Sequence, residues 1–142
     1  MKRTGRRRGF TLVELLVVVL IIGMLGTLLV PKMFKGLGQT KAKIAQTKMV
    51  IIEDALARFH LDCGRLPDES EGGLETLLVA PPELEEKWNG PYLKRSQLED
   101  PWGNLYVYVS EGTINPGSFD IISFGADGQE GGEGENEDLF NE

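Results

Sequence analysis

Residues 10–30 are apolar apart from Glu14 and two threonines, and this run limits what kind of protein the chain can be. An α-helix rises about 1.5 Å per residue, so about 20 apolar residues span the hydrocarbon core of a bilayer. Residues 1–9 carry five positive charges, which predicts a cytoplasmic N-terminus by the positive-inside tendency. A secretory signal peptide would have a shorter apolar run that ends in a small-residue cleavage site. The sequence therefore predicts a single membrane helix over residues 10–30.

Glu14 is the one ionisable side chain inside this run. A carboxylate in the apolar core of a membrane costs roughly 2.5–3.5 kcal/mol on insertion scales. Residues 10–30 contain no Lys or Arg that could pair with it. Two interpretations remain from the residues alone: Glu14 lies near the headgroups and is tolerated, or its partner comes from outside the run.

The residues around Glu14, RGFTLVELL from Arg8 to Leu16, resemble the processing signal of type IV pilin-like precursors. The resemblance implies that a membrane-embedded aspartyl peptidase, the prepilin peptidase, cuts after Gly9 and methylates the new N-terminal amine of Phe10. It also implies a partner for Glu14, the α-ammonium of Phe10 on a neighbouring subunit. Such a pair would set the register of a polymer, because misaligned neighbours leave both charges uncompensated in a low-dielectric setting.

Beyond the membrane run, apolar residues continue at helical spacing on one stripe. A turn-forming Gly64 and Pro67 predict that the helix stops there. Pro31 should interrupt or kink the helix, because it lacks an N–H and its ring clashes with the preceding turn. A tolerated membrane-helix kink and a hinge used in subunit packing are both compatible with it. The stripe consists of Ile44, Ile51, Ile52, Ala55, Leu56 and Phe59.

The remaining residues predict a small head with a hairpin. Residues 105–109 and 119–123 have strand composition, and a Gly/Asn/Pro connection at 112–117 joins them. A short helix is expected around Leu74, Leu77 and Leu78. The predicted fold class is α+β, with a long N-terminal helix packed on a small antiparallel sheet. Four segments resemble, in order, those of the major pseudopilins of type II secretion: GRLPDESEGGLETLL, NGPYL, DPWGNLYVY and FDIISFGADGQEGGEGENEDLFN.

Charge is distributed very unevenly along the chain, whose formal net charge is −7. Residues 1–50 hold ten of the fifteen Lys and Arg and one acid, whereas residues 51–142 hold five basic and twenty-one acidic side chains. This acidity argues against nucleic acid as a partner, because phosphate binding needs a cationic surface. It is compatible with a bound cation.

The acidic charge concentrates at residues 125–138, which contain five glycines and six carboxylates. A solvated, disordered tail is one interpretation of this composition. A calcium loop is the other, because calcium takes six to eight oxygens and glycines let the chain wrap around it. The EF-hand pattern does not fit the spacing of these acids.

The resemblance to major pseudopilins implies a structural Ca²⁺ in this C-terminal loop. Matched by position, Asp127 and Asp138 are the expected carboxylate ligands and Phe124 contributes a backbone carbonyl. Glu133 and Asn136 are the expected sources of further oxygens. Many members of the family end in a tryptophan after the last acidic turn, and Phe140 is expected to act as the apolar anchor here.

The resemblance implies a structural protein rather than an enzyme. Its expected parts are a leader at 1–9, a membrane and filament-core helix at 10–30, a helix extension at 31–63, and a head at 64–142 with a calcium loop at 124–142. Subunits would leave the inner membrane and polymerise into a periplasmic filament that helps drive protein export. Expected partners are copies of the same chain, the prepilin peptidase, minor pseudopilins and the inner-membrane assembly platform.

Three other functions are weighed against this one. A surface-fibre pilin for adhesion, motility or DNA uptake often has a C-terminal disulfide loop, which the single Cys63 excludes. A membrane-anchored hydrolase would use His60 and Cys63, which are three residues apart and could share a helix face. A calcium-dependent recognition head would need a binding pocket. Cys63 is otherwise expected to be a small buried residue at the helix end.

Overall fold

The computed structural model describes residues 9–141, including their side chains except those of residues 26–37. The expected leader residues 1–8 and Glu142 lie outside this description. The chain divides into two units, Met1–Gly36 and Leu37–Glu142. Helix α1, Leu12–Cys63, contributes residues to both units.

The predicted long helix is confirmed, because α1 is a single assigned helix of 52 residues. Gly64 ends it with a φ of 78°, and its N–H donates to the His60 carbonyl at 2.8 Å. This left-handed residue directly after the helix is a common stop signal. The backbone at Pro31 is helical, so the predicted interruption there is wrong. A proline removes one N–H from the helical ladder, and the flanking turns can keep the helix.

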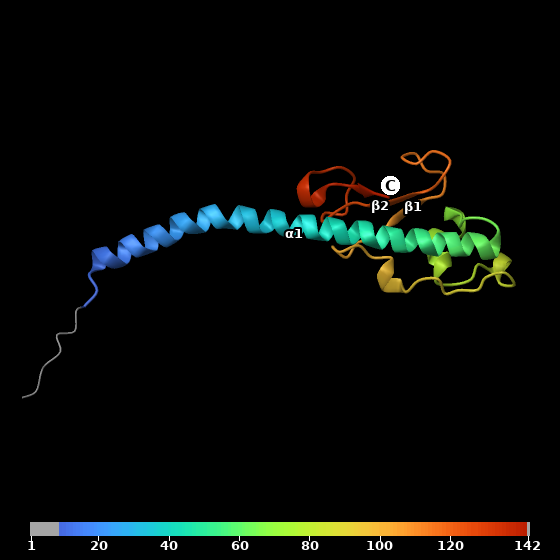
Figure 1. Cartoon of the computed structure of the whole chain (residues 1–142), viewed down its shortest axis with the longest axis horizontal. Helices are drawn as coiled ribbons and strands as arrows, with labels where there is room; N and C mark the ends of the chain where they lie inside the picture. Colours follow the sequence, from blue (N-terminus) through green and yellow to red (C-terminus); the bar gives the residue numbers. More distant parts are fainter. Residues whose placement is uncertain (1–8, 142) are drawn as a thin grey trace, which may run out of the picture. The chain divides into compact units, whose positions relative to one another are not determined.

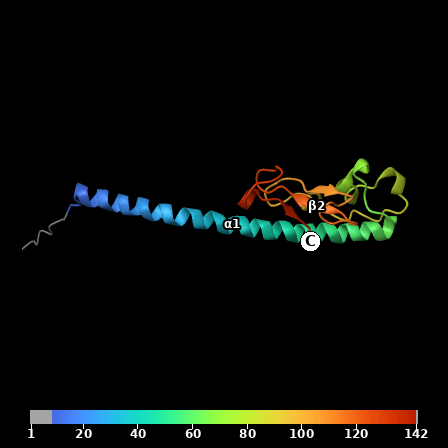
Figure 2. The ribbon, with the colours of Figure 1, turned by 90° about the horizontal axis from the view of Figure 1, so that it is seen from above.

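One face of α1 forms the core of the head, as the apolar stripe predicted. Ile52, Ala55, Leu56 and Phe59 are all fully buried. Figure 2 shows the sheet and the loops on one side of this part of α1. Phe59 also makes an edge-to-face contact with Tyr92, with ring centroids 5.8 Å apart. The buried core cluster comprises Met49, Ile52, Ala55, Leu56, Phe59, Cys63, Leu74, Leu77, Leu93, Leu98, Tyr106, Tyr108 and Ile121.

The stripe begins at different residues from those predicted. Ile44 is 46% exposed, whereas Ala45 and Met49 are buried. Seven residues make nearly two helical turns, so Ala45 lies on the same face of α1 as Ile52. Ile44 is one residue earlier and is therefore rotated by about 100° from Ala45 around the helix axis. Ala45 also contacts the head directly, because its carbonyl accepts a hydrogen bond from the Tyr106 hydroxyl at 3.0 Å.

The predicted hairpin is present within a three-stranded antiparallel sheet (Figure 1). Strand β1 is Val107–Val109, β2 is Asp120–Ser123 and β3 is Leu139–Phe140, in the spatial order β1-β2-β3. Tyr108 pairs with Ile121, and Ser123 pairs with Leu139. Strand β3 places the C-terminal residues beside β2. The sequence did not predict this strand.

Short 3₁₀ helices and turns complete the head. The helix expected around Leu74 and Leu77 is present as η2, a 3₁₀ helix whose Leu74 and Leu77 side chains are buried. The Tyr108 hydroxyl donates to the Pro67 carbonyl at 3.1 Å. This hydrogen bond holds the segment that precedes η2. Burial raises the pKa of Tyr108 to about 12, so the hydroxyl stays protonated at neutral pH. The 3₁₀ helices are η1 (Glu69–Glu71), η2 (Gly73–Leu77), η3 (Pro82–Leu84), η4 (Arg95–Gln97) and η5 (Gly134–Asn136).

We predict that Phe59→Ala lowers the free energy of unfolding by about 3–5 kcal/mol, because it removes a fully buried aromatic ring and leaves a cavity. The matched control is Leu61→Ala, two residues further along α1, where the side chain is 80% exposed. That change should stay within about 0.5 kcal/mol. Denaturant unfolding of the full-length chain in detergent micelles measures both. Equal losses in the two variants would contradict the assigned core face of α1.

Candidate functional site

The start of α1 carries a reciprocal pair of hydrogen bonds between Thr11 and Glu14. The Thr11 hydroxyl oxygen accepts from the Glu14 backbone N–H at 3.2 Å, and Glu14 Oε2 accepts from the Thr11 backbone N–H at 3.4 Å. This capping-box arrangement satisfies N–H groups that the first helical turn leaves without partners. The expected cleavage residues Gly9 and Phe10 lie directly before it, and Phe10 is 78% exposed. Glu14 therefore has local partners within its own chain.

The apolar side chains that follow this cap are exposed to solvent in the single chain. Those of Leu, Val, Ile and Met between Leu12 and Leu25 are 46–80% exposed. A contiguous apolar surface of this extent is typical of a segment that contacts lipid or other protein chains. Among the residues that the structure describes, no helix is long and apolar enough to cross a membrane.

The acidic C-terminal segment is an ordered loop rather than a disordered tail. It leaves β2 at Ser123, includes η5, and enters β3 at Leu139. Two of its glycines are close to other backbone atoms. A Cβ on Gly125 would lie 2.6 Å from the Glu135 carbonyl oxygen, and one on Gly132 would lie 2.6 Å from that of Asn136. The glycine content thus has a steric reason, because the loop folds tightly back on itself.

Asp127 and Asp138, the two expected carboxylate ligands, lie in this loop with different environments. Asp127 Oδ1 accepts a hydrogen bond from the Gln129 N–H at 3.2 Å. Asp138 Oδ2 accepts from the Gly131 N–H at 2.9 Å. Asp138 Oδ1 is buried, and none of the described residues donates a hydrogen bond to it. A buried carboxylate oxygen without a donor is costly and fits a cation as its missing partner.

The other expected ligands lie on the same loop, but their side chains do not form a carboxylate cluster. Glu133 directly precedes η5, and its carbonyl accepts from the Asn136 N–H at 3.3 Å. Phe124 directly follows β2. Within residues 9–141, no three His, Cys, Asp or Glu side chains gather as a metal-binding group. A cation here would therefore need carbonyl or amide oxygens in addition to Asp127 and Asp138.

Comparison with known protein families decides the class of protein. The family described as "Type II secretion system (T2SS), protein G" matches residues 32–142, and "Prokaryotic N-terminal methylation motif" matches residues 4–30. The chain belongs to the type II secretion system protein G family. The type II secretion system core protein G of Vibrio cholerae is 41% identical, over 99% of this chain and 95% of its own length. That of Pseudomonas aeruginosa is 40% identical, over 96% of this chain and 95% of its own.

A solved structure agrees with this assignment to the protein G family. The crystal structure of the major pseudopilin from the type 2 secretion system of enterohaemorrhagic Escherichia coli is 28% identical and matches with a TM-score of 0.57. The match covers 72% of this chain and 87% of that one. The predicted pilin-like α+β fold is thereby confirmed, and the match favours a secretion pseudopilin over a surface-fibre pilin.

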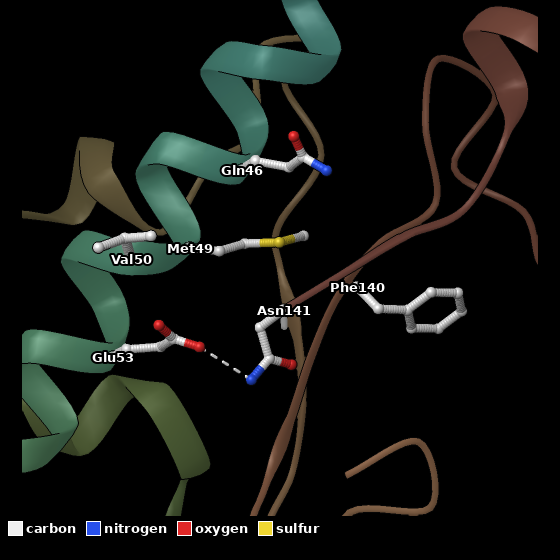
Figure 3. Close-up of a pocket in the computed structure, with 6 residues that line it drawn as sticks. All are labelled: Gln46, Met49, Val50, Glu53, Phe140 and Asn141. Atoms are coloured by element: carbon white, nitrogen blue, oxygen red, sulfur yellow. Dashed lines mark hydrogen bonds between the residues drawn. The ribbon is translucent and has the colours of Figure 1, made fainter.

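In this member of the protein G family, Asn141 closes the C-terminal loop, a role that sequence analysis did not predict. Its Oδ1 accepts from the Ile121 N–H at 2.7 Å, and its Nδ2 donates to Glu53 Oε1 at 3.0 Å. Figure 3 shows the second bond between the C-terminal strand and α1. An amide side chain at the end of an acidic sequence carries no recognisable pattern, so only the fold reveals this contact.

Phe140 does not act as the expected apolar anchor. Its ring points away from α1 in Figure 3, and it is absent from the residues packed on the core, which include Leu139 instead. Neighbouring residues of a strand point to opposite faces of the sheet. Because Leu139 packs on the core, the half-buried Phe140 lies on the opposite face of the sheet.

A second buried polar group, Asp120, orders the connection between β1 and β2. Its fully buried carboxylate accepts hydrogen bonds from the N–H groups of Thr113, Ile114 and Asn115 at 2.7–2.9 Å. Burial alone would raise the pKa of this carboxyl, but the backbone donors outweigh it and hold the pKa below its ordinary value. Asn115 then donates from Nδ2 to the Asn141 carbonyl at 3.2 Å. The hairpin connection and the C-terminus are thus joined.

The geometry of His60 and Cys63 does not support a thiolate–imidazolium pair. Cys63 is buried and 5% exposed, as expected of a small residue at the helix end, whereas His60 is exposed. Burial and then the nearby Asp62 carboxylate raise the pKa of the Cys63 thiol. A raised pKa disfavours the thiolate that nucleophilic chemistry needs.

We predict a pH-dependent cost for Asp120→Asn. The folded-state pKa lies below the ordinary 3.8, so the charged carboxylate stabilises the fold above that pH and loses this contribution as the pH falls through the folded pKa. The variant should be less stable than the wild type by about 1–3 kcal/mol at neutral pH. The difference should shrink below about pH 4. Denaturant unfolding in chelator across this range measures it, and a difference independent of pH would contradict the assignment.

Proposed function

We propose that the chain is the major structural subunit of the type II secretion pseudopilus. It polymerises from the inner membrane into a periplasmic filament that helps drive protein export. One structural observation supports the proposal independently of family membership. The apolar surface of residues 12–25 is uncovered in the single chain and lies within residues 4–30, which match the methylation motif. A filament core built from such helices buries this surface in every subunit.

Before assembly, the subunit is anchored in the inner membrane by a single helix over residues 10–30, with a cytoplasmic N-terminus and a periplasmic head. The five positive charges of residues 1–9 support this orientation. The prepilin peptidase removes the leader after Gly9 and methylates Phe10. Further partners are the minor pseudopilins and the inner-membrane assembly platform. A hinge at Pro31 is part of the same proposal. The helix is continuous at this residue, and a hinge there would let it bend as subunits pack.

Glu14 sets the register of the filament in this proposal. Its carboxylate accepts hydrogen bonds from the Thr11 N–H and hydroxyl at 3.3–3.4 Å, long enough to be exchanged for a shorter charge-assisted bond. The α-ammonium of Phe10 on a neighbouring subunit supplies that partner. A subunit placed out of register would leave both charges buried without compensation, which is strongly unfavourable.

We predict that Glu14→Leu separates processing from assembly. The variant should still yield a mature chain that begins at N-methylated Phe10, but pelletable filaments should fall at least tenfold, because the register pair is lost. The matched control is Glu83→Leu, which removes an exposed carboxylate of the head and should assemble as the wild type does. Intact-mass spectrometry and filament sedimentation measure the two steps.

Two outcomes would contradict different parts of this proposal. A mature chain that begins at a residue other than Phe10 would contradict the assigned cleavage site. Normal filaments from Glu14→Leu would contradict the register role of Glu14 while leaving the cleavage site intact.

The C-terminal loop holds a structural Ca²⁺ in this proposal. Asp127 and Asp138 supply carboxylate oxygens, Phe124 supplies a backbone carbonyl, and Glu133 and Asn136 supply further oxygens. The buried Asp138 Oδ1 without a donor supports this assignment. Bound calcium would neutralise clustered carboxylates and tie the two limbs of the loop together, so its binding energy would stabilise the head.

We predict that calcium raises the melting temperature of the full-length chain in detergent. At free calcium 100 times its Kd, stabilisation should reach about 2.7 kcal/mol. Asp138→Asn should lose most of this gain. Glu130→Gln, which removes one charge from an exposed residue of the same loop, should keep it. Identical melts in calcium and in chelator would remove calcium from the account. An equal loss in both variants would indicate a net-charge effect instead of coordination.

A further inference from the structure

A turn at residues 100–104, with the sequence DPWGN, lies against the start of the C-terminal loop. Asp100 builds this turn, because its buried Oδ1 accepts hydrogen bonds from the N–H groups of Trp102 at 2.9 Å and Asn104 at 2.8 Å. The Asp100 N–H donates to the Asn104 carbonyl at 2.7 Å and closes the turn. Lys41 of α1 lies over the Trp102 ring at 5.9 Å from its centroid, so the turn is also held against the helix.

The same Asp100 carboxylate reaches the last residue of β2. Its Oδ2 accepts from the Ser123 hydroxyl at 2.7 Å, and both side chains are at most 4% exposed. A hydrogen bond to a buried carboxylate is about twice as strong as a neutral one. Ser123 is therefore fixed in position directly before Phe124.

Asn104 holds the residue on the other side of Phe124. Its Nδ2 donates to the Gly125 carbonyl at 2.8 Å. Its Oδ1 lies 3.2 Å from the position that a Cβ on Gly128 would occupy, so the loop passes close to this amide. Ser123 and Gly125 are both tied to one turn, and the Phe124 carbonyl lies between them.

We propose that Asp100 and Asn104 are positioning residues for calcium, which fix the first limb of the loop before the ion binds. The inference rests on the calcium site proposed above and adds the residues that shape it. Neither side chain is one of the proposed calcium ligands. Groups that orient a ligand without touching the metal commonly contribute tenfold or more to affinity. A limb ordered in advance also loses less conformational freedom when the ion binds.

Asn104→Ala tests the inference by removing the tie to the Gly125 carbonyl while leaving every proposed calcium ligand in place. The matched control is Tyr108→Phe, which also removes one bond from a side-chain donor to a backbone carbonyl, at Pro67. Both variants should lose similar stability in chelator. Isothermal titration of the full-length chain in detergent should give a calcium Kd about tenfold weaker for Asn104→Ala. The Kd of Tyr108→Phe should stay within twofold of the wild type.

Terbium luminescence gives a second readout that general destabilisation would not change. Lifetimes in H₂O and D₂O report how much water remains on the bound ion, and Asn104→Ala should admit more water than Tyr108→Phe. Ser123→Ala, which breaks the tie on the other side of Phe124, should act in the same direction. Wild-type calcium affinity in Asn104→Ala would overturn the positioning role and leave the calcium site standing. A wild-type chain that binds no calcium would overturn the site and this inference together.

Discussion

The head depends on the buried face of α1. Its sheet has three strands of two to four residues, and such a small sheet is not stable in water without packing against another element. The single cysteine allows no internal disulfide. Burial of Met49, Ile52, Leu56 and Phe59 therefore provides the main driving force for folding. One continuous helix thus supplies the exposed apolar segment at its start and the core of the head at its end.

Buried polar side chains fix the loops where the short strands end. Asp100 closes the DPWGN turn and reaches Ser123, Asp120 orders the hairpin connection, and Asn141 ties the C-terminus to α1. Each of these groups is satisfied by several hydrogen bonds, which is the condition under which polar groups can be buried at acceptable cost. The acidic loop is consequently held at both ends by the fold. In its interior, the buried Asp138 Oδ1 has no donor among residues 9–141.

Local signals predicted the parts of the fold that depend on local chemistry. Helical periodicity, the stop at Gly64 and the strand composition of the hairpin all indicated elements that the structure contains. The prediction that Ile44 begins the core stripe is wrong, since Ala45 is the buried residue there. A shift of one residue changes the helix face but hardly changes the spacing of apolar residues in the sequence. Strand β3 and the contacts of Asn141 were missed, because they join residues far apart in the sequence. The expected ligands Asp127 and Asp138 rest on family resemblance, since the spacing of the acids matched no known calcium loop.

We propose that an ion completes a loop whose ends the fold already holds. Amide hydrogen exchange of the full-length chain in detergent, with calcium and with chelator, tests this most directly, because exchange reports local opening. Calcium should slow exchange within residues 124–138. The Asn104 and Ile121 amides, which side chains of the fold already bind beside the two ends of the loop, should be protected even in chelator. Unchanged exchange in the loop would contradict the claim. Asn104 and Ile121 amides that are protected only in calcium would also contradict it, because the ends of the loop would then not be fixed in advance.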